Sequence, residues 1–287
     1  MATLLTVLLD GLAYGMVLFI ISIGLTVTLG LMRVVNLAHG AFAMTGGYIA
    51  AVLVAAGVPF WLAAASAAVL TGVLGAVLER FLFRPLYRKG DLAQSLMTFG
   101  LTFVIIATLT TVFGANIKNL PLPAALQGNL DLGFRAYPAY RMFLLGAGLV
   151  ILFLLWLVID CTRFGARLRA AVDNPRMSQA IGINVNALFT LTFAGGCALA
   201  ALGAVLGAQL LPLEPYYALR YLVLFLVVVG VGGTGNYKGS FLAALALGLI
   251  DTAGKYFLPG VSAYLFYGVV IALLLWRPQG LMPGKAA

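Results

Sequence analysis

The sequence is short of charge. Only 9% of its 287 residues are Asp, Glu, Lys or Arg, whereas 63% are hydrophobic and the mean hydropathy is +1.09. A soluble domain has about 25% charged residues and about 45–50% apolar ones, so this chain lacks the side chains to cover a water-facing surface. The scarcity excludes an ordinary soluble enzyme and a disordered chain, and it indicates a polytopic membrane protein.

Cysteine and histidine are scarce too. The chain has two cysteines, Cys161 and Cys197, and one histidine, His39. Two cysteines in or beside apolar segments predict small hydrophobic side chains, not a disulfide framework. A single histidine without a neighbouring carboxylate or cysteine predicts no metal site, and nothing in the sequence predicts a cofactor. The start of the chain has no basic segment or cleavage site, so we expect the first helix to be its own insertion signal.

Motifs of enzymes are missing as well. The pairs Gly254-Lys255 and Gly284-Lys285 lack the upstream glycine and the following Ser or Thr of a phosphate-binding P-loop. Residues 230–235 match GxGxxG. A dinucleotide site needs this motif in a soluble βαβ unit, and the flanking sequence is too hydrophobic for one. No Ser-His-Asp or paired-carboxylate constellation is evident. The sequence therefore predicts that the chain is not an enzyme and does not hydrolyse ATP itself.

Long apolar runs predict an all-α fold. A helix needs about 20 apolar residues to cross the bilayer, and the charge-free runs predict eight or nine transmembrane helices, some of them broken. We place these helices at residues 4–31, 40–57, 60–82, 93–113, 139–160, 187–211, 219–232, 239–254 and 261–277. The segments 219–232 and 239–254 are short enough to be one broken element or two half-spans.

The basic residues predict the orientation. With nine alternating helices, 12 of the 17 Lys and Arg residues fall on one side, which the positive-inside rule assigns to the cytoplasm. The five on the other side are Lys118, Arg135, Arg141, Arg220 and Lys255. The carboxyl terminus is then cytoplasmic, and the loop at about 114–138 lies outside, either as a partner-facing loop or as a plain connector. Topology accounts for the net charge of +9, so we expect no nucleic-acid partner.

Two polar segments interrupt the apolar runs. The first, Arg33–Gly40, contains Asn36 and the lone histidine, His39. We favour a hydrogen-bonded interior residue at a helix break over a proton relay or a ligand for this histidine. The second is the glycine-rich segment 230–235, which a broken membrane helix explains, because backbone interruptions at membrane depth are allowed where they are buried in protein or line a cavity.

These two segments resemble each other. Each has an asparagine followed at short spacing by a glycine and a phenylalanine, and paired interrupted helices are typical of transporters. The two patterns are Asn36-x-x-x-Gly40-x-Phe42 and Asn236-x-x-Gly239-x-Phe241.

The longest polar stretch, at about 161–186, predicts a short cytoplasmic helix between two spans. Its predicted boundaries are Asp173 or Asn174 at the cap, Pro175 at the first position, Ala180 or Ile181 at the end and Gly182 in a left-handed turn after it. Such a helix suits docking into a groove on a soluble partner. A basic loop that only fixes the topology is an equal interpretation from these residues alone.

Several segments together resemble one family. The runs Gly24–Phe42, Arg80–Leu86, Thr98–Leu101, Gly165–Asn184 and Trp276–Leu281 occur in the order found in branched-chain amino acid ABC importer permeases. They are similar to the smaller, H-type, of the two permease subunits. The resemblance covers nearly the whole chain.

The resemblance implies an ABC importer permease fold in a single transmembrane domain, residues 1–287, with a cytoplasmic coupling loop at about 161–186. It implies a subunit of an ATP-driven importer for branched-chain or related amino acids in the bacterial inner membrane, forming half of the translocation path. The implied partners are a second related permease, two cytoplasmic ATPases, a periplasmic binding protein and the amino acid substrate.

The resemblance also implies site residues. The family's ATPase-coupling segment falls on Gly165, Arg169, Ala170, Asn174, Ala180, Gly182, Ile183 and Asn184. Its first broken region, where we expect the translocation path to be lined, falls on Asn36, His39 and Gly40. After the glycine-rich segment this chain departs from the family's Gly-Ser-rich turn, so residues 236–240 receive no substrate role.

Two other classes of function compete. An ion-coupled secondary transporter usually has ionisable residues within its spans, and the candidates here, Asp10, Asp251 and His39, are few and peripheral. A membrane scaffold without transport activity does not need broken helices. The substrate itself stays open between leucine-type amino acids, other amino acids, amides and urea, because we expect the binding protein to discriminate among them.

Overall fold

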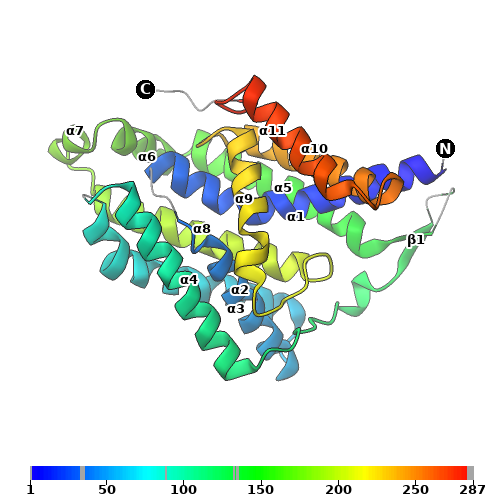
Figure 1. Cartoon of the computed structure of the whole chain (residues 1–287). Coiled ribbons are helices and arrows are strands. Elements are labelled where there is room, and N and C mark those ends of the chain that lie inside the picture. The colour runs from blue at the N-terminus through cyan, green and yellow to red at the C-terminus, as the bar shows by residue number, and fades with distance from the viewer. Residues whose placement is uncertain (1, 33–35, 88, 132, 134–135, 283–287) are drawn as a thin grey trace.

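The structure is a computed structural model that describes residues 2–32, 36–87, 89–131, 133 and 136–282. In this part of the chain, nine long helices form a bundle, two short helices cap one end of it, and one hairpin lies at the other end (Figure 1). The elements are α1 (Ala2–Met32), α2 (His39–Ala55), α3 (Phe60–Leu78), α4 (Asp91–Phe113), β1 (Asn129–Asp131), β2 (Ala136–Pro138), α5 (Ala139–Cys161), α6 (Arg163–Asp173), α7 (Pro175–Ala180), α8 (Val185–Gly207), α9 (Tyr217–Gly232), α10 (Tyr237–Phe257) and α11 (Ser262–Trp276). A π-helical turn, Glu79–Phe83, and two 3-10 turns, Arg84–Leu86 and Ala124–Leu126, complete the set.

Five helical segments are long and apolar enough to cross a membrane. They are Thr3–Gly30, Phe60–Leu86, Asp91–Phe113, Ala139–Cys161 and Val185–Gly207. The helices α2, α9 and α11 are apolar but shorter, and α10 has 21 residues. The predicted all-α, polytopic membrane fold is confirmed.

The two candidate half-spans are separate helices. Helix α9 ends at Gly232, and α10 begins at Tyr237. Gly233 and Gly235 between them have φ of +98° and +80°, a region that L side chains rarely adopt. These two glycines therefore allow the sharp turn that separates α9 from α10.

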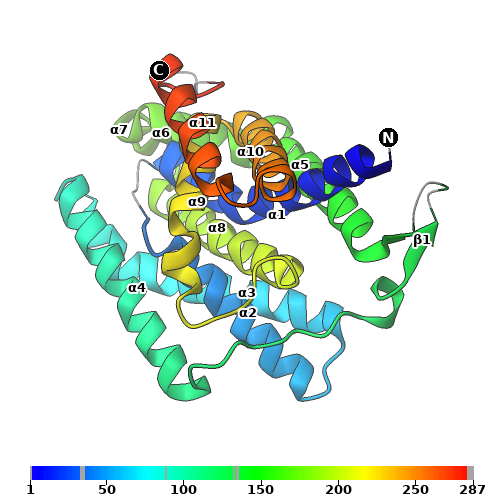
Figure 2. The ribbon, with the colours of Figure 1, turned by 45° about the vertical axis from the view of Figure 1, so that its right-hand side comes forward.

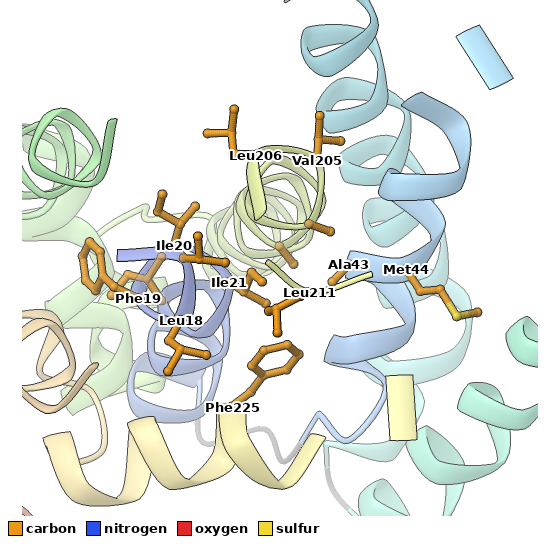
Figure 3. Packing of buried hydrophobic residues seen from close by; sticks show 14 of the residues in the cluster. Leu18, Phe19, Ile20, Ile21, Ala43, Met44, Val205, Leu206, Leu211 and Phe225 are labelled. Atoms are coloured by element: carbon orange, nitrogen blue, oxygen red, sulfur yellow. The ribbon is translucent and has the colours of Figure 1, made fainter. Parts of the chain in front are cut away.

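Helix α1 lies at the centre of the bundle (Figures 1 and 2). It packs against α5, α8, α9 and α10. The four consecutive residues Leu18–Ile21 are all fully buried, and Figure 3 shows their side chains pointing in several directions, toward α8 on one side and Phe225 of α9 on another. A helix that is apolar all round is a core helix, so α1 has no face left for lipid along this stretch.

Glycines let the neighbours of α1 approach closely. A Cβ atom at Gly24 would overlap the carbonyl of Gly196 in α8, and one at Gly30 would overlap Gly235 in the turn before α10. Close backbone approach through small residues is the usual way in which membrane helices associate. These contacts fix α1 against α8 and against the turn before α10.

The bundle has two distinct ends. The start of α1 lies near β1 at the hairpin end, whereas α6 and α7 lie at the opposite end, the α7 end (Figures 1 and 2). At the hairpin end, Asp10 of α1 accepts a hydrogen bond from Tyr137 at 2.8 Å and forms an ion pair with Arg141. The sequence did not predict the hairpin itself. Four residues of the predicted charge distribution, Arg33, Arg88, Arg135 and Lys285, lie outside the described residues.

Candidate functional site

Helix α7 has the predicted boundaries. The side chain of Asn174 accepts a hydrogen bond from the backbone N–H of Met177 at 3.0 Å, and Pro175 occupies the first helical position. The helix ends at Ala180, and Gly182 follows with φ of +86°. An asparagine cap, a proline at the first turn and a left-handed glycine are local signals, which is why the sequence predicted this helix correctly.

Helix α7 projects from its end of the bundle (Figure 1). Among its residues only Ser178 is buried. Met177 is 60% exposed, and Ile181, directly after the helix, is 68% exposed, with the basic side chain of Arg176 beside them. These side chains of α7 are therefore accessible for contact with another molecule.

Helix α6 precedes α7 and was not predicted. The Thr162 hydroxyl caps it by accepting a hydrogen bond from the backbone N–H of Gly165 at 3.4 Å. Its inner face carries Leu168 and Ala171, which are buried. The helix therefore lies on the bundle by an apolar stripe and leaves its basic side chains outside.

A carboxylate at the end of α5 joins three helices. The Tyr237 hydroxyl of α10 donates a hydrogen bond to Asp160 at 2.5 Å, and the Lys238 ammonium lies 3.4 Å from the same oxygen. Arg169 of α6 lies 3.8 Å from the other carboxylate oxygen and donates to the carbonyl of Ile159 at 2.5 Å. We call Asp160, Arg169, Tyr237 and Lys238 the Asp160 cluster. It links α6 to the start of α10.

A second carboxylate joins α3 to α8. Glu79 is fully buried and accepts hydrogen bonds from Arg84 at 3.0 Å, Thr190 at 2.6 Å and Tyr87 at 2.9 Å. Burial and then the charge of Glu79 raise the pKa of the Tyr87 phenol, which favours the protonated form that donates to Glu79. We call Glu79, Arg84, Tyr87 and Thr190 the Glu79 cluster. It fixes the first turns of α8, directly after α7, to the end of α3.

The predicted coupling residues fall into two groups. Ala180 and Gly182 are exposed on and after α7. Most of the other predicted coupling residues stabilise the backbone between the end of α5 and the start of α8. Gly165 packs against the carbonyl of Ile159, Arg169 belongs to the Asp160 cluster, and Asn174 caps α7. Asn184 caps α8 by accepting from Ala187 at 3.0 Å, while Ala170 and Ile183 are half-buried.

The predicted path residues lie in the interior. His39 is fully buried at the first position of α2, with its Nε2 atom 2.7 Å from the carbonyl oxygen of Ile21. This confirms the interpretation of a hydrogen-bonded interior histidine at a helix break. Gly40 packs against the backbone of Ala218, and Asn36 is 1% exposed.

Helix α4 satisfies the backbone of this break. The Leu37 N–H donates to the Thr98 hydroxyl at 3.2 Å, and its carbonyl accepts from Thr102 at 3.4 Å. Asn36 Nδ2 and His39 Nδ1 have no hydrogen-bond partner among the described residues. The break is thus covered by α4 but retains two buried polar atoms with free hydrogen-bonding capacity.

The predicted similarity of the two breaks has a structural counterpart. The Asn36 side chain accepts from the backbone N–H of Ala38 at 3.1 Å before α2. The Asn236 side chain accepts from Lys238 and Gly239, both at 3.1 Å, before α10. Asn236 therefore caps α10, whereas Asn36 bonds to the N–H of the residue just before α2.

Sequence reasoning missed Glu79, Asp160 and the two threonines of α4. Glu79 directly precedes the family motif that starts at Arg80, and an ionisable residue at the end of an apolar span is a signal in itself. Thr98 begins one of the family motifs, but nothing in the sequence indicates that it and Thr102 bond to the backbone of Leu37, more than 60 residues away.

Comparison with known proteins gives the same family as the sequence motifs. Residues 7–275 match the family model described as "Branched-chain amino acid transport system / permease component". The permease protein BraD of Pseudomonas aeruginosa, named for high-affinity branched-chain amino acid transport, is 29% identical over 96% of this chain and 94% of its own. The corresponding LivH protein of Escherichia coli is 25% identical over 95% of this chain and 93% of its own.

One solved structure has a similar fold. PsaBC from Streptococcus pneumoniae in complex with Fab superposes with a TM-score of 0.51 and 15% identity, covering 95% of this chain and 90% of that one. At this identity the likeness concerns the fold alone.

Proposed function

Because the chain belongs to the family of branched-chain amino acid transport permease components, we propose that it is a permease subunit that forms half of the translocation path of an ATP-driven importer. The proposed cargo is a branched-chain or related amino acid. The chain contains no P-loop of its own, so the proposal assigns ATP hydrolysis to separate subunits.

Helix α7 carries the proposal. It is a capped helix outside the bundle with exposed Met177 and Ile181, and we propose that it docks into a groove on a cytoplasmic ATPase. The flanking clusters support a mechanical role for this contact. Helix α7 contacts α6 and α8. In the proposed mechanism, a shift of α7 moves α8, which the Glu79 cluster ties to α3, and α6, which the Asp160 cluster ties to α10.

The proposed mechanism is alternating access. A ligand shifts a conformational equilibrium only if it binds the two states with different affinity, so ATP must bind the closed ATPase pair more tightly than the open pair. Closure then moves α7, and the helices around the path reorient. The α7 end is the cytoplasmic end in this scheme, and the carboxyl terminus lies on the same side.

We propose that Asn36, His39 and Gly40 belong to the region where the path opens. The free polar atoms of Asn36 and His39 and the covering threonines of α4 support this assignment. In the conformation described, α4 covers the break, so opening here requires α4 to move away from Leu37.

The proposed partners follow from the same scheme. Exposed apolar side chains on α4, such as Phe103, and on α11, such as Leu275, leave surfaces for lipid or for the second, related permease. A second cytoplasmic ATPase and a periplasmic binding protein complete the assembly. An amide or urea as cargo would leave all of these contacts unchanged, because we expect the binding protein to select the substrate.

The docking proposal is tested by Ala180→Asp and Gly182→Arg. Both substitutions place a charge at the exposed end of α7, and we expect loss of ATPase co-purification and of uptake, with membrane insertion unchanged. Gly57→Arg is the matched control for the glycine variant. Gly57 has the same φ of +86°, and like Gly182 it has no atom near the position of an added Cβ, but it lies in the α2–α3 turn.

Undiminished complex formation and uptake in both α7 variants contradict the docking assignment. Uptake by the chain alone in proteoliposomes, without any ATPase, contradicts the ATP-driven mechanism and supports an ion-coupled transporter instead.

A further inference from the structure

An apolar cavity of about 280 Å³ lies between α1, α5, α6 and α8. Its wall includes Leu154, Val158, Phe164, Leu168, Leu191 and Leu199. The one polar side chain in the wall, Thr192, donates its hydroxyl to the carbonyl of Leu188 at 2.8 Å. Water is not stable in a cavity that offers it no partners, so an apolar group is the fitting occupant.

The cavity opens to the outside of the bundle. Leu154 of α5 is 50% exposed and Leu191 of α8 is 61% exposed. Both helices are long and apolar enough to span the membrane, and Val158 in the wall lies two residues before Asp160, near the charged end of α5. The opening therefore faces the acyl-chain region just below the lipid headgroups on the α7 side.

Helix α6 places positive charge beside this opening. Phe164 and Leu168, one helical turn apart, line the cavity, and the residue before each of them is an arginine. Arg163 and Arg167 are exposed and form no ion pair within the part of the chain that the structure describes. The apolar face of α6 thus borders the cavity, and its two arginines lie exposed next to that face, as long basic side chains do beside apolar surface.

We propose that this cavity binds one acyl chain of an anionic phospholipid and that Arg163 and Arg167 hold its phosphate. The ligand must have an apolar part for the cavity and a negatively charged part for the arginines. An anionic phospholipid has both, its acyl chain and its headgroup. An apolar helix of another protein would fill the cavity but leave two arginines at its edge without a partner. The proposal concerns a different surface from α7 and does not depend on ATPase docking.

Gly195 allows a direct test. It lines the cavity, and an added Cβ there would meet no atom within 4 Å. Gly195→Leu therefore places an apolar side chain in the cavity at a position where the backbone leaves room for a Cβ. Gly146→Leu is the matched control, because Gly146 of α5 is equally open but does not line the cavity. Arg163→Gln with Arg167→Gln removes the charge, and Arg80→Gln, at an exposed arginine elsewhere, is its control.

The measurement is native mass spectrometry of the purified full chain from nanodiscs of phosphatidylglycerol or phosphatidylcholine. We expect one phosphatidylglycerol to be retained by the parent and by both controls. Gly195→Leu should lose it, and the double arginine variant should lower its retention about tenfold. Equal retention by Gly195→Leu and the parent overturns the cavity assignment, and equal retention by the double arginine variant and the parent overturns the phosphate assignment. Equal retention of both lipids by the parent overturns the choice of an anionic lipid, because phosphatidylcholine has the same phosphate but no net charge.

A second measurement uses photocrosslinking. Phosphatidylglycerol with a diazirine on its acyl chain, photolysed with the parent chain in membranes, should label peptides that contain residues 151–168 and 191–199. Labelling confined to other helices, or crosslinking of a polypeptide to a photoreactive group at Val158, overturns the proposal in favour of a protein contact.

Discussion

Glu79 is the most enclosed acidic side chain at the α7 end. Its carboxylate is fully buried, and Arg84, Tyr87 and Thr190 all donate to it. A buried charge is stable only when it is paired and hydrogen-bonded. Here Arg84 and Tyr87 come from the α3–α4 connection and Thr190 comes from α8, so the cluster holds these two segments together.

Glu79→Ala should therefore destabilise the protein strongly. The substitution leaves the partly buried Arg84 without its counter-ion, and we expect a loss of about 2–4 kcal/mol. Thermal unfolding of the purified chain measures this loss. Asp131→Asn, at an exposed hairpin residue, is the control and should leave the unfolding temperature nearly unchanged.

Arg84→Gln combined with Glu79→Gln tests the cause. If the unpaired charge is responsible, the double variant is more stable than the sum of the two single effects predicts. Strict additivity would show that the two side chains act independently and would contradict the cluster.

At the scale of elements, α7 depends on its cap. It has only six residues, and so short a helix is not stable by itself. The Asn174 side chain and the left-handed Gly182 define its two ends, and the contacts of α6 and α8 hold it in place.

Asn174→Ala should loosen α7 without unfolding the bundle. Loss of the cap costs about 0.5–2 kcal/mol, and we expect faster amide hydrogen exchange over residues 175–181, with the exchange of α8 unchanged. Asn174→Ser keeps a capping oxygen and should retain the parent rates. Equal rates in the parent and in Asn174→Ala would mean that the cap does not stabilise this helix.

The elements differ in how far the sequence predicted them. The boundaries of α7 and the nine long helices followed from signals within a few residues of each other. Helix α6 was missed because its apolar stripe of Phe164, Leu168 and Ala171 is short and interrupted by arginines. The Glu79 cluster was beyond prediction, because Glu79 and Thr190 are 111 residues apart and only the packing of α3 on α8 brings them together.

At the scale of the whole molecule, the ion pairs are divided between the two ends of the bundle. The ion pairs of Arg84, Arg169 and Lys238 lie at the α7 end, whereas Arg141 pairs with Asp10 at the hairpin end. This division agrees with the distribution of basic residues from which the cytoplasmic side was predicted.

The native cysteines test the orientation. Cys161, at the α7 end, is exposed, and Cys197 is buried. A membrane-impermeant maleimide should label Cys161 in inverted vesicles and not in intact spheroplasts. The variant Cys161→Ser/Leu130→Cys moves the exposed cysteine to the hairpin. It should be labelled in intact spheroplasts and not in inverted vesicles. Labelling of Cys161 from outside would place α7 away from the cytoplasm and contradict both the orientation and the docking proposal.

The central position of α1 has a consequence for synthesis. Its Thr26 hydroxyl lies 2.8 Å from that of Ser240 in α10, and 214 residues separate them. At about 5–20 residues per second, the ribosome needs about 10–40 s to make the chain between them. Helix α1 is thus made long before the helix that completes its enclosure. Until α10 arrives, Gly11 and Gly15, which pack against the backbone of α10 in the folded chain, face lipid or a chaperone, and a chain cut short before α10 leaves this surface of α1 uncovered.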